Sequence, residues 1–277
     1  MAGSNDHNAT MIENLIRGVT VAGAFKHFAM QEAWDRASAT YLERRGDRVD
    51  AVAYGNLAPT DRELGLLGEL RGLRVLDLGC GGGHNAVACA LAGAQVVGVD
   101  LSKTQLLAAQ ALADEHDVVV AWHHASGLSL EGLVGAPFDL VLAIQVLPYV
   151  EEPAALLHAI RALVRPGGRL IVSIDHPLRN CFFDAEMDEF TPYPARSYFD
   201  NEPIEWRFAP DVPMVAHHQP LGQWVEWLLE AGWQLRRLIE APAPQAVCDE
   251  LWPEDSPLSP LRMIPHTAIL VAQVPAL

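Results

Sequence analysis

Short apolar runs alternate with amphipathic stretches through most of the chain. Between residues 75 and 175 the apolar runs predict five strands, at 75–78, 96–99, 118–122, 138–147 and 169–175. Apolar residues at helical spacing separate several of these runs, at 86–92, 103–115 and 153–163. Strands that alternate with helices form a mostly parallel sheet covered on both faces. The pattern therefore predicts an α/β fold with a doubly wound sheet.

The two ends of the chain depart from this alternation. Helical spacing predicts helices at 24–44 and 221–231, and a third at 61–70, where Thr60 and Glu63 have capping-box spacing. Apolar runs at 233–239 and 267–273 predict two further strands, and the proline-rich stretch between them is expected to be irregular. We expect an N-terminal helical cap over residues 1–64 and a sheet domain over residues 65–277.

Residues 176–220 interrupt the sheet domain with seven prolines and eight aromatic residues. Prolines at this density exclude a long helix, and the runs 205–208 and 214–217 predict a hairpin. The insertion follows the carboxyl end of a predicted strand, which is where ligands bind in such sheets. We therefore expect it to be a lid that binds the substrate, with a structural arm or a dimer contact as the alternative.

The first predicted strand ends in a cluster of glycines. Glycine has no Cβ, so the chain can turn tightly there and approach a ligand closely, and the next helix begins at the same point with free N–H groups. Asp100 ends the second strand about 20 residues later, where such folds place an acid that accepts the ribose hydroxyls. A dinucleotide fingerprint requires a sixth-position glycine, and His84 stands there instead. The stretch therefore predicts an adenosine-containing ligand that is not a dinucleotide.

The pattern Asp77-x-Gly79-x-Gly81-x-Gly83 resembles the S-adenosylmethionine site of the class I methyltransferases that act on small molecules. The resemblance covers residues 65–175 well and 220–277 loosely. It implies a seven-stranded sheet that ends in an antiparallel pair, with S-adenosyl-L-methionine as cofactor and S-adenosyl-L-homocysteine as product. In that family the loop holds the methionine end of the cofactor, and the acid anchors its amino group.

The resemblance also implies which residues contact the cofactor: Asp77, Gly79, Cys80, Gly81, Gly83, Asp100, Leu101, Ser126, Gly127, Ile144, Gln145 and Tyr41. Ser126 stands where the family has an acid that accepts from the adenine amino group, and a hydroxyl accepts more weakly. Trp34 and Tyr41 belong to a segment similar to the family's cap helix, from which an aromatic closes over the cofactor. The alternative is that both aromatics only pack the cap against the core.

Composition limits the choice of substrate. The formal net charge is −16, with 19 basic and 35 acidic residues, and the sequence has no basic stripe, which argues against a nucleic-acid partner and favours a small or cationic acceptor. The sequence has no apolar run of about 18 residues and no secretory signal, so we expect no membrane span. The four cysteines lack metal-ligand spacing, so we expect a cytoplasmic protein without a metal site. The sequence leaves the oligomeric state open.

Catalytic candidates follow the predicted strands. Methyl transfer to a hydroxyl, ammonium or acidic carbon requires loss of a proton, for which histidine is suited. The candidates are His176, beside Asp175 as its orienting partner, then His217 and His218, and Tyr149 as a residue that positions the acceptor. At most one of the adjacent His217 and His218 is expected to enter the site.

Three functions remain open at this point. The first is methylation of a small, partly apolar metabolite at oxygen, nitrogen or carbon, in secondary metabolism for example. The second is another reaction on the same fold, such as a cyclisation, that keeps the cofactor without methyl transfer. The third is ligand binding without chemistry.

Overall fold

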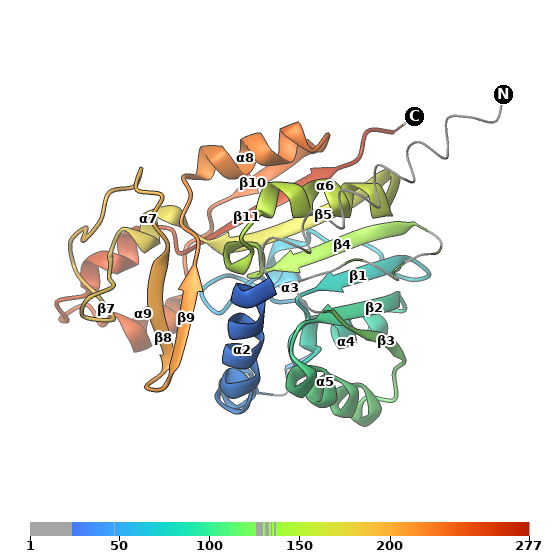
Figure 1. Ribbon diagram of the computed structural model, residues 1–277, viewed down its shortest axis with the longest axis horizontal. Helices are drawn as coiled ribbons and strands as arrows, with labels where there is room; N and C mark the ends of the chain where they lie inside the picture. The colour runs from blue at the N-terminus through green and yellow to red at the C-terminus, as the bar shows by residue number, and fades with distance from the viewer. Residues whose placement is uncertain are drawn as a thin grey trace.

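The chain folds around a seven-stranded sheet in a computed structural model that describes residues 24–46, 48–125, 130, 133, 135 and 137–276. The strand order is β10-β11-β5-β4-β1-β2-β3. The bounds are β1 Arg74–Leu78, β2 Gln95–Asp100, β3 Val120–His124, β4 Phe138–Ile144, β5 Val164–Asp175, β10 Gln234–Ile239 and β11 Thr267–Gln273. The strands β3, β2, β1, β4 and β5 pair in parallel, and β11 runs antiparallel to both of its neighbours (Figure 1). The doubly wound fold and the antiparallel pair at its end are confirmed.

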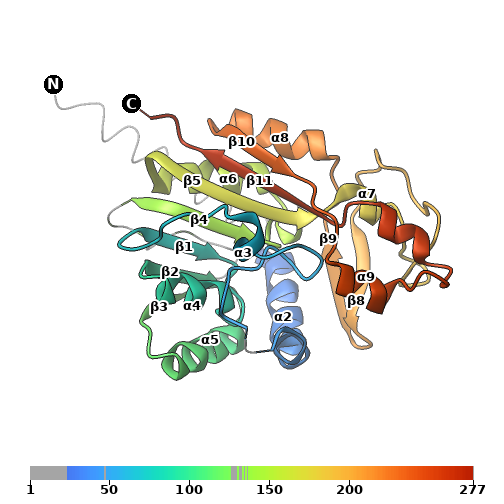
Figure 2. The ribbon, with the colours of Figure 1, turned by 180° about the vertical axis from the view of Figure 1, so that it is seen from behind.

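Helices cover both faces of this sheet. The main helices are α4 His84–Leu91, α5 Lys103–Glu115, α6 Pro153–Leu163 and α8 Leu221–Glu230. Apolar residues of α6 and α8 share one core with the sheet, and those of α4 share another with residues 52–70. Seen from behind, the short helix α3 (Asp61–Leu64) lies over the face opposite to α6 (Figure 2).

Two local predictions were wrong. The helix expected at 61–70 ends at Leu64, because Gly65 adopts the left-handed conformation with a φ of 61° and closes the helix. The capping box of Thr60 and Glu63 is present as expected. The stretch expected to be irregular holds α9 (Gln245–Leu251) and the 3₁₀ helix η3 (Ser259–Met263).

The helix α2 (Ala24–Arg45) and the insertion stand together at the carboxyl end of the parallel strands. The insertion contains α7 Pro177–Asn180, the short strands β6 Phe183–Asp184 and β7 Glu189–Phe190, and the hairpin β8 Ile204–Ala209 with β9 Val212–Ala216. The hairpin is therefore confirmed, and both views place it beside α2 (Figures 1 and 2). Ala33 and Ala37 of α2 pack against Val212 and Met214 in a separate small core.

In the part of the chain that the structure describes, no helix has both the length and the apolar character that crossing a membrane requires.

Candidate functional site

The glycine loop between β1 and α4 is built so that larger residues do not fit. Gly79, Gly81 and Gly83 have φ values of 69°, 53° and 81°, in the region that favours glycine. A Cβ on Gly79 would lie 2.6 Å from Cγ2 of Val146, and one on Gly83 would lie 2.7 Å from Cβ of Ala109. The loop thus turns sharply at the end of β1 and presents backbone to the space above it.

Asp77 lies beneath this loop with an unused acceptor atom. Its side chain is 2% exposed, and its Oδ2 has no hydrogen-bond partner among the described residues. Burial raises the pKa of Asp77 to about 7, helped by the negative charge of Asp100. A buried carboxylate oxygen without a donor is costly, so this atom marks a place for a cationic or hydrogen-donating ligand.

Asp100, at the end of β2, holds the other side of the loop. Its Oδ2 accepts a hydrogen bond from the Gly81 N–H at 2.8 Å, and its Oδ1 accepts one from the Ser102 N–H at 2.8 Å. Burial raises the pKa of Asp100, while these backbone donors act in the opposite direction. Each oxygen keeps a second lone pair for a ligand.

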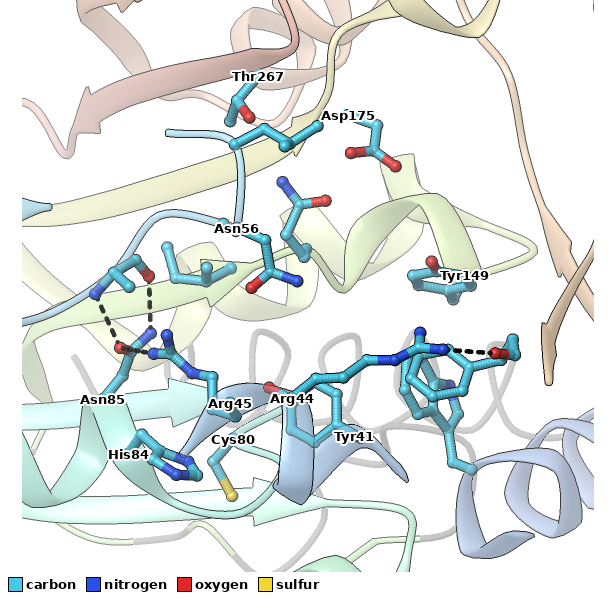
Figure 3. Close-up of a pocket in the computed structure, with 18 of the residues that line it drawn as sticks. Tyr41, Arg44, Arg45, Asn56, Cys80, His84, Asn85, Tyr149, Asp175 and Thr267 are labelled. Atoms are coloured by element: carbon cyan, nitrogen blue, oxygen red, sulfur yellow. Dashed lines mark hydrogen bonds between the residues drawn. The ribbon is translucent and has the colours of Figure 1, made fainter. Parts of the chain in front are cut away.

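Two cavities meet above the loop, with volumes of about 110 and 500 Å³. The smaller one is lined by Asp100 and Leu101 and by Gln105, whose Oε1 is buried without a partner among the described residues. The larger one reaches from Asp77 and Cys80 to the insertion (Figure 3). Six residues line both cavities: Trp34, Tyr41, Gly79, Ile144, Gln145 and Tyr149. The two cavities are therefore neighbouring parts of one site.

Gln145 and the aromatic residues of α2 form the junction between the cavities. Gln145 has a φ of 56°, which is uncommon for a residue with a side chain and occurs often at functional sites. The Trp34 ring makes edge contacts with Tyr41, at 6.1 Å between centroids, and with Tyr149, at 5.5 Å. Trp34 also packs against the small core between α2 and the hairpin. Trp34 therefore takes part in both arrangements that the sequence left open, lining the site and packing the cap.

The far end of the larger cavity combines aromatic and polar groups. Trp206 and Phe208 come from the hairpin, and Asp175, Arg179 and Thr267 come from the end of the sheet and the start of the insertion. Nη1 of Arg179 lies 3.1 Å from Oδ2 of Asp175. Six further residues line this cavity that the sequence did not predict: Arg44, Arg45, Asn56, Asn85, Arg179 and Thr267. Of these residues, only Arg179 had a signal in the sequence, because it follows Asp175 by four positions.

The candidate histidines lie outside both cavities. His176 is buried, its Nδ1 accepts a hydrogen bond from the Leu178 N–H, and its Nε2 lies 2.7 Å from Oε1 of Glu240. The expected pairing of His176 with Asp175 is wrong, because Asp175 pairs with Arg179 and points into the cavity.

The two remaining histidines follow the hairpin. His218 is fully buried, with Nε2 3.0 Å from the Tyr198 carbonyl oxygen, and the His217 N–H donates to the Pro148 carbonyl oxygen. Neither lines either of these two cavities, whereas Tyr149 lines both. Ser126 and Gly127 lie outside the described residues.

Comparisons with known proteins relate the chain to methyltransferases. Residues 76–170 match a family described as "Methyltransferase domain". A relative from Alkalilimnicola ehrlichii, named "Ubiquinone biosynthesis O-methyltransferase", is 42% identical over 107 residues, which cover 39% of this chain and 43% of the relative. The chain thus spans about half the length of the curated relatives it matches.

Solved structures cover more of the chain. An S-adenosylmethionine-dependent methyltransferase from Mesorhizobium loti is 27% identical, with a TM-score of 0.63, over 76% of this chain and 94% of that one. A [4+2]-cyclase is 20% identical, with a TM-score of 0.58, over 89% of this chain and 95% of that one. The similarity to the cyclase concerns the fold alone.

Proposed function

We propose that the chain is a class I S-adenosylmethionine-dependent methyltransferase, which transfers a methyl group from S-adenosyl-L-methionine to a small, partly apolar acceptor. The cofactor occupies the junction of the two cavities, and the acceptor occupies the end of the larger cavity beside the hairpin. The product of the cofactor is S-adenosyl-L-homocysteine.

The unpartnered Oδ2 of Asp77 carries this proposal. A cofactor with an ammonium group supplies the donor that this buried oxygen lacks, in a loop whose glycines leave room for close approach. Arg45 lines the same cavity, and its positive charge lowers the pKa of Asp77 against the larger effect of burial. An ammonium group at Asp77 and a carboxylate near Arg45 match the amino-acid end of the cofactor.

The smaller cavity fits the adenosine end. The Asp100 carboxylate has lone pairs for two ribose hydroxyls, and Gln105 offers a second buried acceptor in its Oε1. Tyr41 and Trp34 line the junction from α2.

The cofactor, when bound, supplies an electrophilic methyl group on a positively charged sulfur. The residues of this chain then hold the acceptor in line with that group, which is a large part of catalysis for a displacement of this kind. The name of the Alkalilimnicola relative supports an oxygen acceptor, and the aromatic walls of the larger cavity support an acceptor with apolar surface.

Calorimetric titration with S-adenosyl-L-homocysteine and, in parallel, with NAD tests the cofactor assignment. We expect micromolar binding of the first and no binding of the second. Asp249→Asn, which alters an exposed carboxylate outside both cavities, is the matched control and should leave the affinity unchanged. The proposal is contradicted if S-adenosyl-L-homocysteine does not bind, or if NAD binds.

Transfer of a labelled methyl group to an acceptor panel tests the chemistry separately. Cofactor binding without transfer to any acceptor would refute the transferase part of the proposal and would leave the cofactor part standing.

A further inference from the structure

The polar end of the larger cavity holds a carboxylate with one oxygen in use and one available. Asp175 ends β5 and lines the cavity, and its Oδ2 is held by Nη1 of Arg179 at 3.1 Å. Its Oδ1 accepts no hydrogen bond from the described residues, and its side chain is 39% exposed. A ligand in the cavity can therefore donate a hydrogen bond to this oxygen.

Tyr149 offers the complementary group beside it. Burial and the negative charge of Asp175 raise the pKa of Tyr149, so its phenol keeps its proton at neutral pH. The hydroxyl has no hydrogen-bond partner among the described residues, and Tyr149 and Asp175 border the same space (Figure 3). A single ligand hydroxyl can accept from Tyr149 and donate to Asp175.

Two arginines at this end have a charge or ring partner, although Nε of Arg179 is buried without a hydrogen-bond partner among the described residues. The Arg179 guanidinium binds Asp175 and lies over the Phe190 ring, 4.5 Å from its centroid. The Arg44 guanidinium lies over the Phe208 ring at 4.8 Å. A ligand at this end of the cavity therefore meets an available carboxylate oxygen rather than an uncompensated positive charge. This favours a ligand that donates a hydrogen bond over an anionic ligand.

Aromatic side chains form the remaining walls. Trp34, Tyr149, Trp206 and Phe208 line the larger cavity, with Trp34 and Trp206 each in ring contact with Phe208. Flat, rigid surfaces of this kind pack well against an aromatic ring.

We propose that the acceptor is a flat aromatic molecule with a hydroxyl group, and that Asp175 is the residue that receives its proton. This inference rests on the proposed function and names the substrate class of the same site. The hydroxyl proton passes to Oδ1 of Asp175, the hydroxyl oxygen gains the methyl group, and the sulfonium keeps the electron pair of the broken carbon–sulfur bond and becomes a neutral thioether.

Three naphthalene derivatives of similar shape test the inference through binding measurements alone. Protein saturated with S-adenosyl-L-homocysteine is titrated in a calorimeter with 2-naphthol, which donates a hydrogen bond, 2-methoxynaphthalene, which does not, and 2-naphthoate, which is an anion. We expect 2-naphthol to bind about tenfold more tightly than 2-methoxynaphthalene, the size expected for a hydrogen bond to a charged group.

The Asp175→Asn variant keeps the side-chain size and replaces the charged acceptor with a neutral one. We expect the preference for 2-naphthol to fall to about threefold or less, because hydrogen bonds between neutral groups are weaker. The control is Asp249→Asn, whose carboxylate is also paired with an arginine, Arg262 at 2.8 Å, but lies outside the cavities. The control should keep the full preference.

Equal binding of 2-naphthol and 2-methoxynaphthalene overturns the inference, as does tighter binding of 2-naphthoate or binding of none of the three probes. An unchanged preference in Asp175→Asn overturns the role of Asp175. If that variant does not fold, the probe series on the unaltered protein still decides the acceptor class. Failure of the proposed function is seen separately, as failure of S-adenosyl-L-homocysteine itself to bind.

Discussion

The affinity for the cofactor should depend on the proton that Asp77 carries. Burial and the nearby Asp100 raise its pKa to about 7, so the free protein is mixed in its protonation near neutral pH. Only the carboxylate form attracts an ammonium group strongly. With a pKa of about 7, roughly a tenth of the protein is ionised at pH 6.0 and roughly three quarters at pH 7.5.

The expected result is an affinity for S-adenosyl-L-homocysteine about eightfold weaker at pH 6.0 than at pH 7.5, or about 1.2 kcal/mol. Calorimetry at the two pH values measures this difference, and buffers of different ionisation enthalpy count the proton that binding releases at pH 6.0. Asp77→Asn should weaken binding about tenfold at pH 7.5, through loss of a hydrogen bond to a charged group, and should remove most of the pH dependence. An equal pH dependence in the unaltered protein and the Asp77→Asn variant would refute the reasoning.

The proton on Asp77 should also affect the free energy of unfolding of the protein without ligand. Between pH 4 and 7 the folded state keeps a proton on Asp77 that the unfolded chain has released, so the free energy of unfolding falls as the pH rises, by up to about 1.4 kcal/mol per pH unit from this group. Urea unfolding at pH 5 and 7 measures this slope. Asp77→Asn should flatten it, and an unchanged slope would place the titration elsewhere.

Three further changes test other parts of the site. Gly83→Ala should destabilise the fold by about 2 kcal/mol or more in urea unfolding, because the added Cβ would meet Ala109 at 2.7 Å at a φ of 81°, whereas Gly222→Ala, with nothing within 4 Å, should not. Asp100→Ala should weaken S-adenosyl-L-homocysteine binding by about tenfold or more in calorimetry, and unchanged affinity would exclude its contact with the ribose. Trp34→Ala should weaken the binding of both the cofactor and 2-naphthol, since its side chain lines both cavities. Weaker binding of only one of these ligands would contradict a shared wall at Trp34.

Much of the fold followed from local patterns in the sequence. The helix expected at 103–115 is present as α5, capped by Ser102, which accepts a hydrogen bond from the Gln105 N–H, and the apolar run of β4 is buried in the centre of the sheet. The stretch 241–265 was expected to be irregular because of its prolines. Pro244 stands at the N-cap of α9, outside the helix, where proline removes no helical hydrogen bond. The number of prolines in a stretch therefore does not exclude a helix when a proline stands directly before it.

The two halves of the site differ in how far the sequence predicts them. The proposed cofactor half is local, since Asp77, the glycines and Asp100 lie within one strand–turn–helix–strand unit. The proposed acceptor half takes its residues from α2, residues 53–57, the end of β5 and the hairpin, which only tertiary structure brings together. The expected pairing of His176 with Asp175 was wrong for a related reason, because adjacent residues at a strand end face different surroundings.

The helix α2 connects these two halves through neighbouring side chains. Oδ1 of Asp35 accepts a hydrogen bond from the Ser102 hydroxyl at 2.5 Å, which ties α2 to the loop that follows Asp100. The next residue, Arg36, pairs with Asp211 at 2.8 Å and ties α2 to the tip of the hairpin. Asp35 and Arg36 directly follow Trp34, whose side chain lines both cavities. The helix α2 is therefore anchored both to the loop after β2 and to the hairpin, next to a residue that both cavities share.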